Sequence, residues 1–157
     1  MAFAVYTTFG VFAQSLRLTS VPLLVEPGAR LAVREFAAAL VIIGLPVLIA
    51  TGPLSGPVSH LLAPGLSAGG RHETAMGLPI LGIAMTLQLW AAGGATVLAI
   101  RSRFNTVAGA YIAGSIAGLV AFLALMNVAG VQTLGWSMLA MAIVTCGWMM
   151  EIGRAHV

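Results

Sequence analysis

The feature that most constrains this chain is the length of its uncharged stretches. No charged side chain lies between Glu35 and Arg71, and none lies between Glu73 and Arg101. A helix that crosses a bilayer needs about 20 mostly apolar residues. Only 7% of the 157 residues are charged, whereas an average soluble domain has roughly 25%. Because the chain cannot cover itself with a polar surface, we predict an all-α membrane protein.

Five segments are long and apolar enough to be transmembrane helices. They cover residues 3–25, 36–62, 75–100, 107–126 and 134–150. The second segment contains three prolines and three glycines, a density that predicts a bent or broken helix. In transporters such a break often lines a cavity or forms a hinge, although neighbouring helices can equally repair a simple kink.

The sequence APGLSAGGRHET, residues 63–74, separates the second and third segments. Pro64 ends the preceding helix, because proline lacks an N–H donor and disfavours helix in the residue before it. We predict a tight loop over residues 63–74, with its charges in water. Ser67 or Thr74 can cap the helix that follows.

The distribution of arginines predicts the orientation in the membrane. Loops 26–35 and 101–106 fall on one side and carry two arginines each, whereas loops 63–74 and 127–133 on the other side carry one arginine together. The four arginines on the first side are Arg30, Arg34, Arg101 and Arg103. Positive charge collects on the cytoplasmic side. We therefore expect loops 26–35 and 101–106 to be cytoplasmic and the other two loops to lie outside.

The two ends of the chain are not expected to be the ends of the native protein. The predicted orientation places Met1 outside, so we expect the native protein to have a further helix upstream. The last seven residues, EIGRAHV, translate a common sequencing-adapter sequence. We therefore expect residues 151–157 to be an artefact rather than part of the fold.

The sequence argues against several classes of function. It has no lysine, no basic run and no alternation of aromatic and basic residues, so it lacks the pattern of a nucleic-acid-binding protein. It contains no aspartate, and Glu26, Glu35 and Glu73 fall in predicted loops. We expect no enzyme active site, no metal site and no cofactor. The lone Cys146 excludes an internal disulfide and is expected to be a small packing residue.

Arg17 is the one charge expected within the depth of the membrane. An ionisable residue there indicates a functional site, because burying it without a partner is costly. In a cavity, an arginine can bind phosphate or pyrophosphate through two parallel hydrogen bonds. Gln14, nearly one turn earlier, can share the same polar face. The alternative is that the helix kinks near Pro22 and Arg17 extends to the headgroups.

Small residues in the fourth segment predict close packing against another helix. Gly114 and Gly118 form a GxxxG motif, and Gly109, Ala113 and Ala117 extend the stripe. Such residues let two helix backbones approach closely in a membrane. The motif predicts packing and carries no indication of catalysis.

Several short motifs occur in a distinctive order. They are Val21-Pro22, then Ala63-Pro64-Gly65-Leu66, then Arg103-Phe104 at the end of a long helix, then GWSMLAMAIV. In this order and spacing, residues 5–150 resemble the amino-terminal lobe of the lipid II flippase family. That family belongs to the multidrug/oligosaccharidyl-lipid/polysaccharide exporter superfamily.

The resemblance implies a bacterial inner-membrane protein with two lobes of six helices that open alternately to either face. This chain would hold the second to sixth helices of one lobe and would act with a second lobe of the same chain. The family moves polyprenyl-pyrophosphate-linked saccharides across the bilayer. Arg17 does not align with an arginine of the family, so the following expectation comes from the residues themselves: Arg17 and Gln14 contact the pyrophosphate, and Arg30 and Arg34 attract it at the mouth. The chain lacks the arginine pair of the family's second helix, so lipid II and other polysaccharide precursors stay open as cargo.

Two other functions stay open. The first is a drug/cation antiporter of the same superfamily, which usually needs a carboxylate inside the membrane; the five segments contain none. The second is a small membrane scaffold protein without transport activity. In that case Arg17 only anchors its helix and the glycines only pack helices together.

Overall fold

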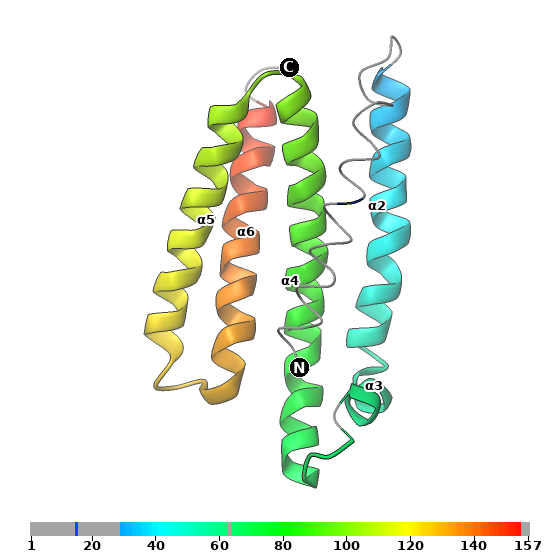
Figure 1. Ribbon diagram of the computed structural model, residues 1–157, viewed down its shortest axis with the longest axis vertical. Helices are drawn as coiled ribbons and strands as arrows, with labels where there is room; N and C mark the ends of the chain where they lie inside the picture. The colour runs from blue at the N-terminus through cyan, green and yellow to red at the C-terminus, as the bar shows by residue number, and fades with distance from the viewer. Residues whose placement is uncertain (1–14, 16–28, 63, 155–157) are drawn as a thin grey trace.

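The computed structural model describes Ser15, residues 29–62 and residues 64–154, and within these the chain is helical without strands (Figure 1). The helices are α2 (Ala29–Thr51), α3 (Ser55–Leu62), α4 (Ala68–Ile100), α5 (Phe104–Leu125) and α6 (Thr133–Arg154), with a short 3-10 helix, η1 (Gly130–Gln132). The all-α prediction is confirmed for this part of the chain. Apart from Ser15, the first predicted span, 3–25, lies outside the described residues.

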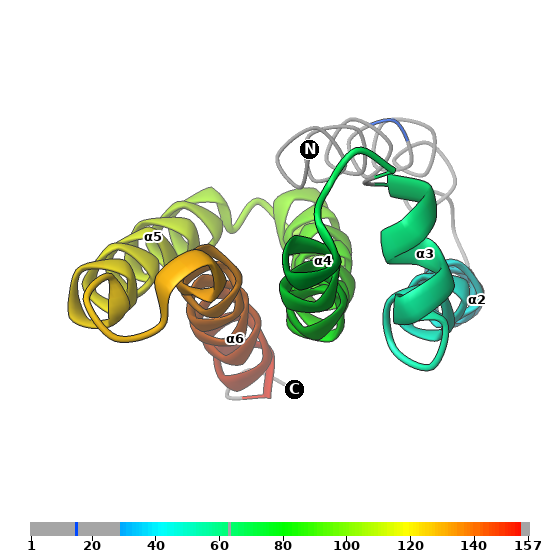
Figure 2. The ribbon, with the colours of Figure 1, turned by 90° about the horizontal axis from the view of Figure 1, so that it is seen from below.

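The long helix α4 forms the centre of the bundle. Seen along the bundle, α4 lies between α2 and α3 on one side and α5 and α6 on the other (Figure 2). Leu89 and Thr96, both on α4, are each 1% exposed and are among the largest fully buried side chains. Because α4 packs against every other helix of the described part, it supplies most of the core.

Four helices, α2, α4, α5 and α6, are long and apolar enough to cross a membrane. The surface of α5 illustrates why they belong there. Ile112, Ile116 and Leu119 lie on α5, and each is at least 58% exposed. An exposed apolar surface of this extent is unusual in water and is typical of a helix that faces lipid. The described part is therefore that of a membrane-embedded helical protein.

Hydroxyl groups inside these helices bond to backbone carbonyl oxygens one turn earlier. Thr51 Oγ1 donates to the carbonyl oxygen of Val47 at 2.7 Å, and Thr145 Oγ1 donates to that of Met141 at 2.8 Å. A polar group without a partner in hydrocarbon costs several kcal/mol. Among the described residues, no buried side-chain nitrogen or oxygen lacks a hydrogen bond. The threonines are thus compatible with apolar surroundings.

Glycines on α4 allow α2 to approach closely. A Cβ atom added at Gly82 would lie 2.7 Å from Cβ of Thr51, and one added at Gly93 would lie 3.2 Å from Cε1 of Phe36. Real Cβ atoms rarely approach other atoms so closely. Side chains of α2 therefore fill the space that the missing Cβ atoms leave on α4.

The α5–α6 hairpin uses the predicted GxxxG motif in the same way. An added Cβ atom would lie 2.9 Å from the Met141 carbonyl oxygen at Gly114, and 3.2 Å from the Ser137 carbonyl oxygen at Gly118. The prediction of close helix packing is confirmed at these two glycines. Gly109 is different, because an added Cβ there has no neighbouring atom within 4 Å.

The second predicted span, 36–62, is two helices instead of one. α2 ends at Thr51 and α3 begins at Ser55, and α3 crosses below the end of α2 (Figures 1 and 2). The predicted break is confirmed in the connection that holds Pro53. Pro46, by contrast, lies inside α2 without ending it.

Two predicted loops prove shorter than expected. α4 begins at Ala68, so the last part of loop 63–74 is helical and Glu73 lies on a helix. Ser67 is the N-cap, since its Oγ accepts a hydrogen bond from the Gly70 N–H at 3.3 Å. The physical reason is length. At 33 residues, α4 is about 50 Å long, so its charged first turns can stay helical beyond a hydrocarbon core of about 30 Å.

The same correction applies to the loop predicted at 26–35. α2 begins at Ala29, which places Arg30, Arg34 and Glu35 on a helix. At the other end of the chain, α6 ends at Arg154, within the segment 151–157.

Candidate functional site

The arginines predicted to share one side of the membrane lie at one end of the bundle. The amino terminus of α2, the carboxyl terminus of α4 and the amino terminus of α5 meet at this end (Figure 1). These termini carry Arg30, Arg34, Arg101 and Arg103. We call this region the arginine end. Arg71 lies at the opposite end, on the first turn of α4.

A tight turn between α4 and α5 separates two of these arginines. Ser102 adopts a positive φ of 59°, which is uncommon for a residue other than glycine. Its N–H bonds to the carbonyl oxygen of Ala99 at 2.9 Å, and the Arg103 N–H bonds to that of Leu98 at 3.0 Å. The backbone bonds that close this turn also fix where Arg101 leaves the helix.

The structure describes two of the four candidate binding residues. Arg34 is exposed on α2, and Arg30 lies on the first turn of the same helix. Arg17 and Gln14 lie outside the described residues. Arg30 and Arg34 thus lie four positions apart on α2, at the arginine end.

A groove of about 310 Å³ opens between α2, α4 and α6 next to the arginine end. We call it the α2–α4–α6 groove. Its lining is almost wholly apolar, and of the described residues that line it Arg101 alone is charged. The lining residues are Val33, Phe36, Ala37, Leu40, Trp90, Ala91, Gly93, Gly94, Val97, Leu98, Arg101, Cys146, Met149 and Met150.

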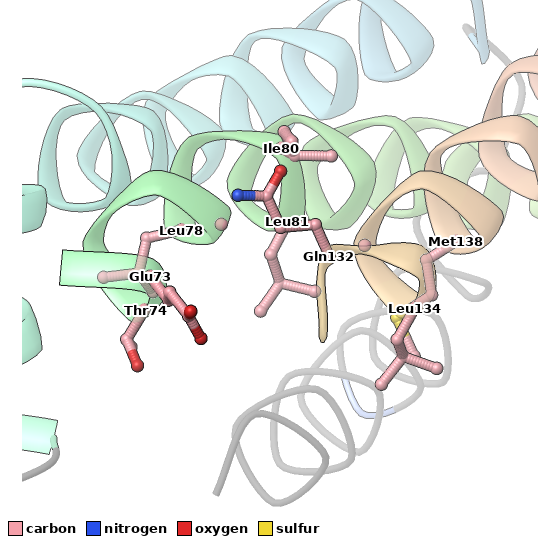
Figure 3. A pocket seen from close by; sticks show the side chains of 10 residues that line it. Glu73, Thr74, Leu78, Ile80, Leu81, Gln132, Leu134 and Met138 are labelled. Carbon is pink, nitrogen blue, oxygen red and sulfur yellow. The ribbon is translucent and has the colours of Figure 1, made fainter. Parts of the chain in front are cut away.

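A smaller pocket of about 160 Å³ lies toward the opposite end, between α4, η1 and the start of α6 (Figure 3). Glu73 and Thr74 line it from α4, and Gln132 lines it from η1. Leu134 and Met138 cover the side formed by α6. Since Glu73 is exposed, the carboxylate keeps its hydration and the pocket places no charge in an apolar interior.

The acidic side chains of the described residues lie apart from one another. No group of three or more His, Cys, Asp or Glu side chains within them could hold a metal ion. Glu35, Glu73 and Glu151 are exposed and lie near helix ends. The arrangement favours binding of an amphiphile, because it combines an apolar groove with a cation at one end.

Trp90 and Cys146 line the groove, although the sequence predicts no functional role for either. Trp90 is 38% exposed and lines the groove from α4. Cys146 is 8% exposed and packs in a cluster with Ala95, Leu98 and Met149, which confirms its expected packing role. Nothing in the local sequence marks either residue as part of a groove, since the groove forms only when three helices pack side by side.

Comparison with known proteins yields no relative. No family model matches the chain, and no curated protein or solved structure shows significant similarity to it.

Proposed function

We propose that the chain is part of one lobe of a bacterial inner-membrane flippase for polyprenyl-pyrophosphate-linked saccharides, either lipid II or another polysaccharide precursor. The observation that carries the proposal is the order and spacing of the motifs Val21-Pro22, Ala63-Pro64-Gly65-Leu66 and Arg103-Phe104. The collection of Arg30, Arg34, Arg101 and Arg103 at one end of a membrane-embedded bundle supports it.

The mechanism follows from charge and from the cost of burying it. A pyrophosphate carries several negative charges, so a cluster of arginines concentrates it at the cytoplasmic mouth. Arg30 and Arg34 provide this attraction, and Arg17 with Gln14 then contacts the headgroup within the bilayer. Transport proceeds by alternating access between this lobe and a second lobe of the same chain. No covalent chemistry is required.

A drug/cation antiporter is less well supported. Coupling to protons or sodium usually requires a carboxylate inside the membrane, where it lines the transport pathway. The acidic side chains of the described helices are exposed near helix ends. They are Glu35, Glu73 and Glu151.

Headgroup binding tests the proposal directly. The purified chain is placed in phosphatidylcholine nanodiscs and titrated with a polyprenyl pyrophosphate, a polyprenyl monophosphate and an uncharged polyprenol, with tryptophan fluorescence as the readout. We expect the pyrophosphate to bind most tightly and the polyprenol least. Since a basic residue near the surface contributes about 1 kcal/mol toward an anionic lipid, Arg34→Gln is expected to weaken pyrophosphate binding about fivefold.

Arg71→Gln is the matched control, because Arg71 lies at the opposite end of the bundle. It is expected to leave pyrophosphate binding unchanged. Equal affinity for the three lipids, or equal losses in Arg34→Gln and Arg71→Gln, would contradict the proposed headgroup recognition.

A further inference from the structure

The α2–α4–α6 groove is apolar along its length and has a cation at one end. Its walls come from three helices, and its described lining is apolar from Trp90 up to the one charged residue, Arg101. We infer that this groove binds one acyl chain of an anionic glycerophospholipid, with Arg101 at its mouth holding the phosphate. The inference does not depend on the proposed transport function.

The depth of the groove matches one leaflet. Trp90 and Arg101 are eleven positions apart on α4, which corresponds to about 16 Å along a helix axis. Half of a typical hydrocarbon core is about 15 Å. An acyl chain whose phosphate lies at Arg101 therefore ends close to Trp90. A polyprenyl chain is much longer than one leaflet, so the groove suits a phospholipid tail better.

The charge at the mouth favours an anionic headgroup. Arg101 is exposed, and the described helix ends that lie at the arginine end, with that of α6 included, carry five arginines against two glutamates, Glu35 and Glu151. The long arginine side chain can lie along apolar surface while its guanidinium stays at headgroup level. It can then donate two hydrogen bonds to one phosphate. A zwitterionic lipid gains less, because its own cation offsets the attraction.

Two small residues, one on α4 and one on α2, leave space for a chain here. Gly94 lines the groove on α4, and a Cβ atom added there would lie in ordinary contact with Met149, 3.6 Å from its sulfur. Ala37 lines the facing side from α2. A larger side chain at either position is expected to occupy the space in which the acyl chain lies.

Fluorescence quenching by brominated lipids tests the inference. The reporter is a chain that keeps Trp90 and carries Trp136→Phe and Trp148→Phe. Both replaced residues are exposed and do not line the groove. The chain is reconstituted in phosphatidylcholine vesicles with increasing amounts of phosphatidylglycerol brominated near the middle of its acyl chains, or of phosphatidylcholine brominated in the same way. We expect the brominated phosphatidylglycerol to quench Trp90 with about fivefold higher apparent affinity.

Variants at the mouth of the groove test recognition of the headgroup, and variants inside the groove test binding of the acyl chain. Arg101→Gln is expected to abolish the preference for phosphatidylglycerol while leaving quenching by both lipids. Arg103→Gln, at the same end but outside the lining of the groove, is the matched control and is expected to keep the preference. Gly94→Leu and, independently, Ala37→Leu are expected to lower quenching by both lipids, with helix content checked by circular dichroism.

Three results would overturn the inference. The first is equal quenching by the two lipids in the reporter chain, and the second is an equal loss of preference in Arg101→Gln and Arg103→Gln. The third is displacement of brominated phosphatidylglycerol by polyprenyl pyrophosphate but not by unbrominated phosphatidylglycerol. That result would assign the groove to the proposed transport substrate, so it would refute the phospholipid while supporting the transport function.

Discussion

At the scale of single residues, glycines on one helix face threonines on the neighbouring helix. The hydroxyl groups of these threonines bond within their own helix. Gly114 faces Thr145, whose hydroxyl donates to the Met141 carbonyl oxygen at 2.8 Å. The glycine provides the space, and the internal hydrogen bond keeps the threonine from needing a partner on the other helix. Two helices can therefore pack closely in lipid without an unsatisfied polar group.

Gly114→Ala is expected to destabilise the α5–α6 hairpin by about 1–3 kcal/mol, the usual cost of overpacking. The added methyl group meets Thr145 and the Met141 carbonyl oxygen, and a backbone atom cannot move aside as a side chain does. Thermal unfolding in detergent measures the change. Gly109→Ala is the control, since the added Cβ meets no atom within 4 Å; an equal effect at both sites would refute the argument.

At the scale of helices, the beginning of α4 shows how a local signal can be correct while the boundary drawn from it is wrong. Ser67 was one of two candidate caps and is the one that the structure uses. The predicted loop nevertheless extended to Thr74, because Gly69 and Gly70 favour turns and the charges after them favour water. A helix that continues beyond the bilayer keeps these charges in water and holds Gly69 and Gly70 in its first turn.

Ser67→Ala is expected to unravel the first turn of α4, at a local cost of about 1 kcal/mol. Amide exchange at Gly70 and Arg71 should become faster, as measured by hydrogen–deuterium exchange in nanodiscs. Thr74→Ala removes a hydroxyl that bonds to the Gly70 carbonyl oxygen at 2.8 Å inside the helix. It should leave that turn protected; faster exchange in Thr74→Ala alone would favour a helix that begins after Thr74.

Patterns along the chain predicted the helices well and the candidate site poorly, for a physical reason. Runs of apolar residues, the break near Pro53 and the contact at Gly114 depend on neighbours in sequence or on one helix face. The α2–α4–α6 groove depends on how three helices are arranged side by side. Arg101 was visible as a positive charge in a loop, but nothing near it in sequence places Trp90 and Cys146 along the same groove.

At the scale of the whole molecule, the described part is a bundle with two unequal ends. The arginine end carries Arg34 and Arg101, among others, and the opposite end carries Arg71 beside Glu73. An excess of arginines on one side predicts that side to be cytoplasmic. The α4–α5 turn and the α5–α6 connection, at opposite ends of the hairpin (Figure 1), are suitable places to test this.

Ser102→Cys and Val128→Cys, each in a Cys146→Ala background, are expected to react with a membrane-impermeant maleimide from opposite sides. Val128 is 83% exposed and Ser102 is also exposed, so both thiols are accessible. In intact cells we expect labelling of Val128→Cys only, with Ser102→Cys labelled after permeabilisation. The reverse pattern would invert the orientation, and labelling of both in intact cells would contradict a membrane-spanning hairpin.

The central position of α4 also has a consequence for biogenesis. Synthesis begins at the amino terminus, so α2 and α3 leave the ribosome before the helix against which both of them pack. Until α4 follows, α2 and α3 lack the helix against which they pack. The α5–α6 hairpin, in contrast, finds α4 already in place. A nascent chain interrupted before residue 100 therefore presents membrane proteases with an incompletely packed helix, whereas later interruptions leave the α2–α4 pair intact.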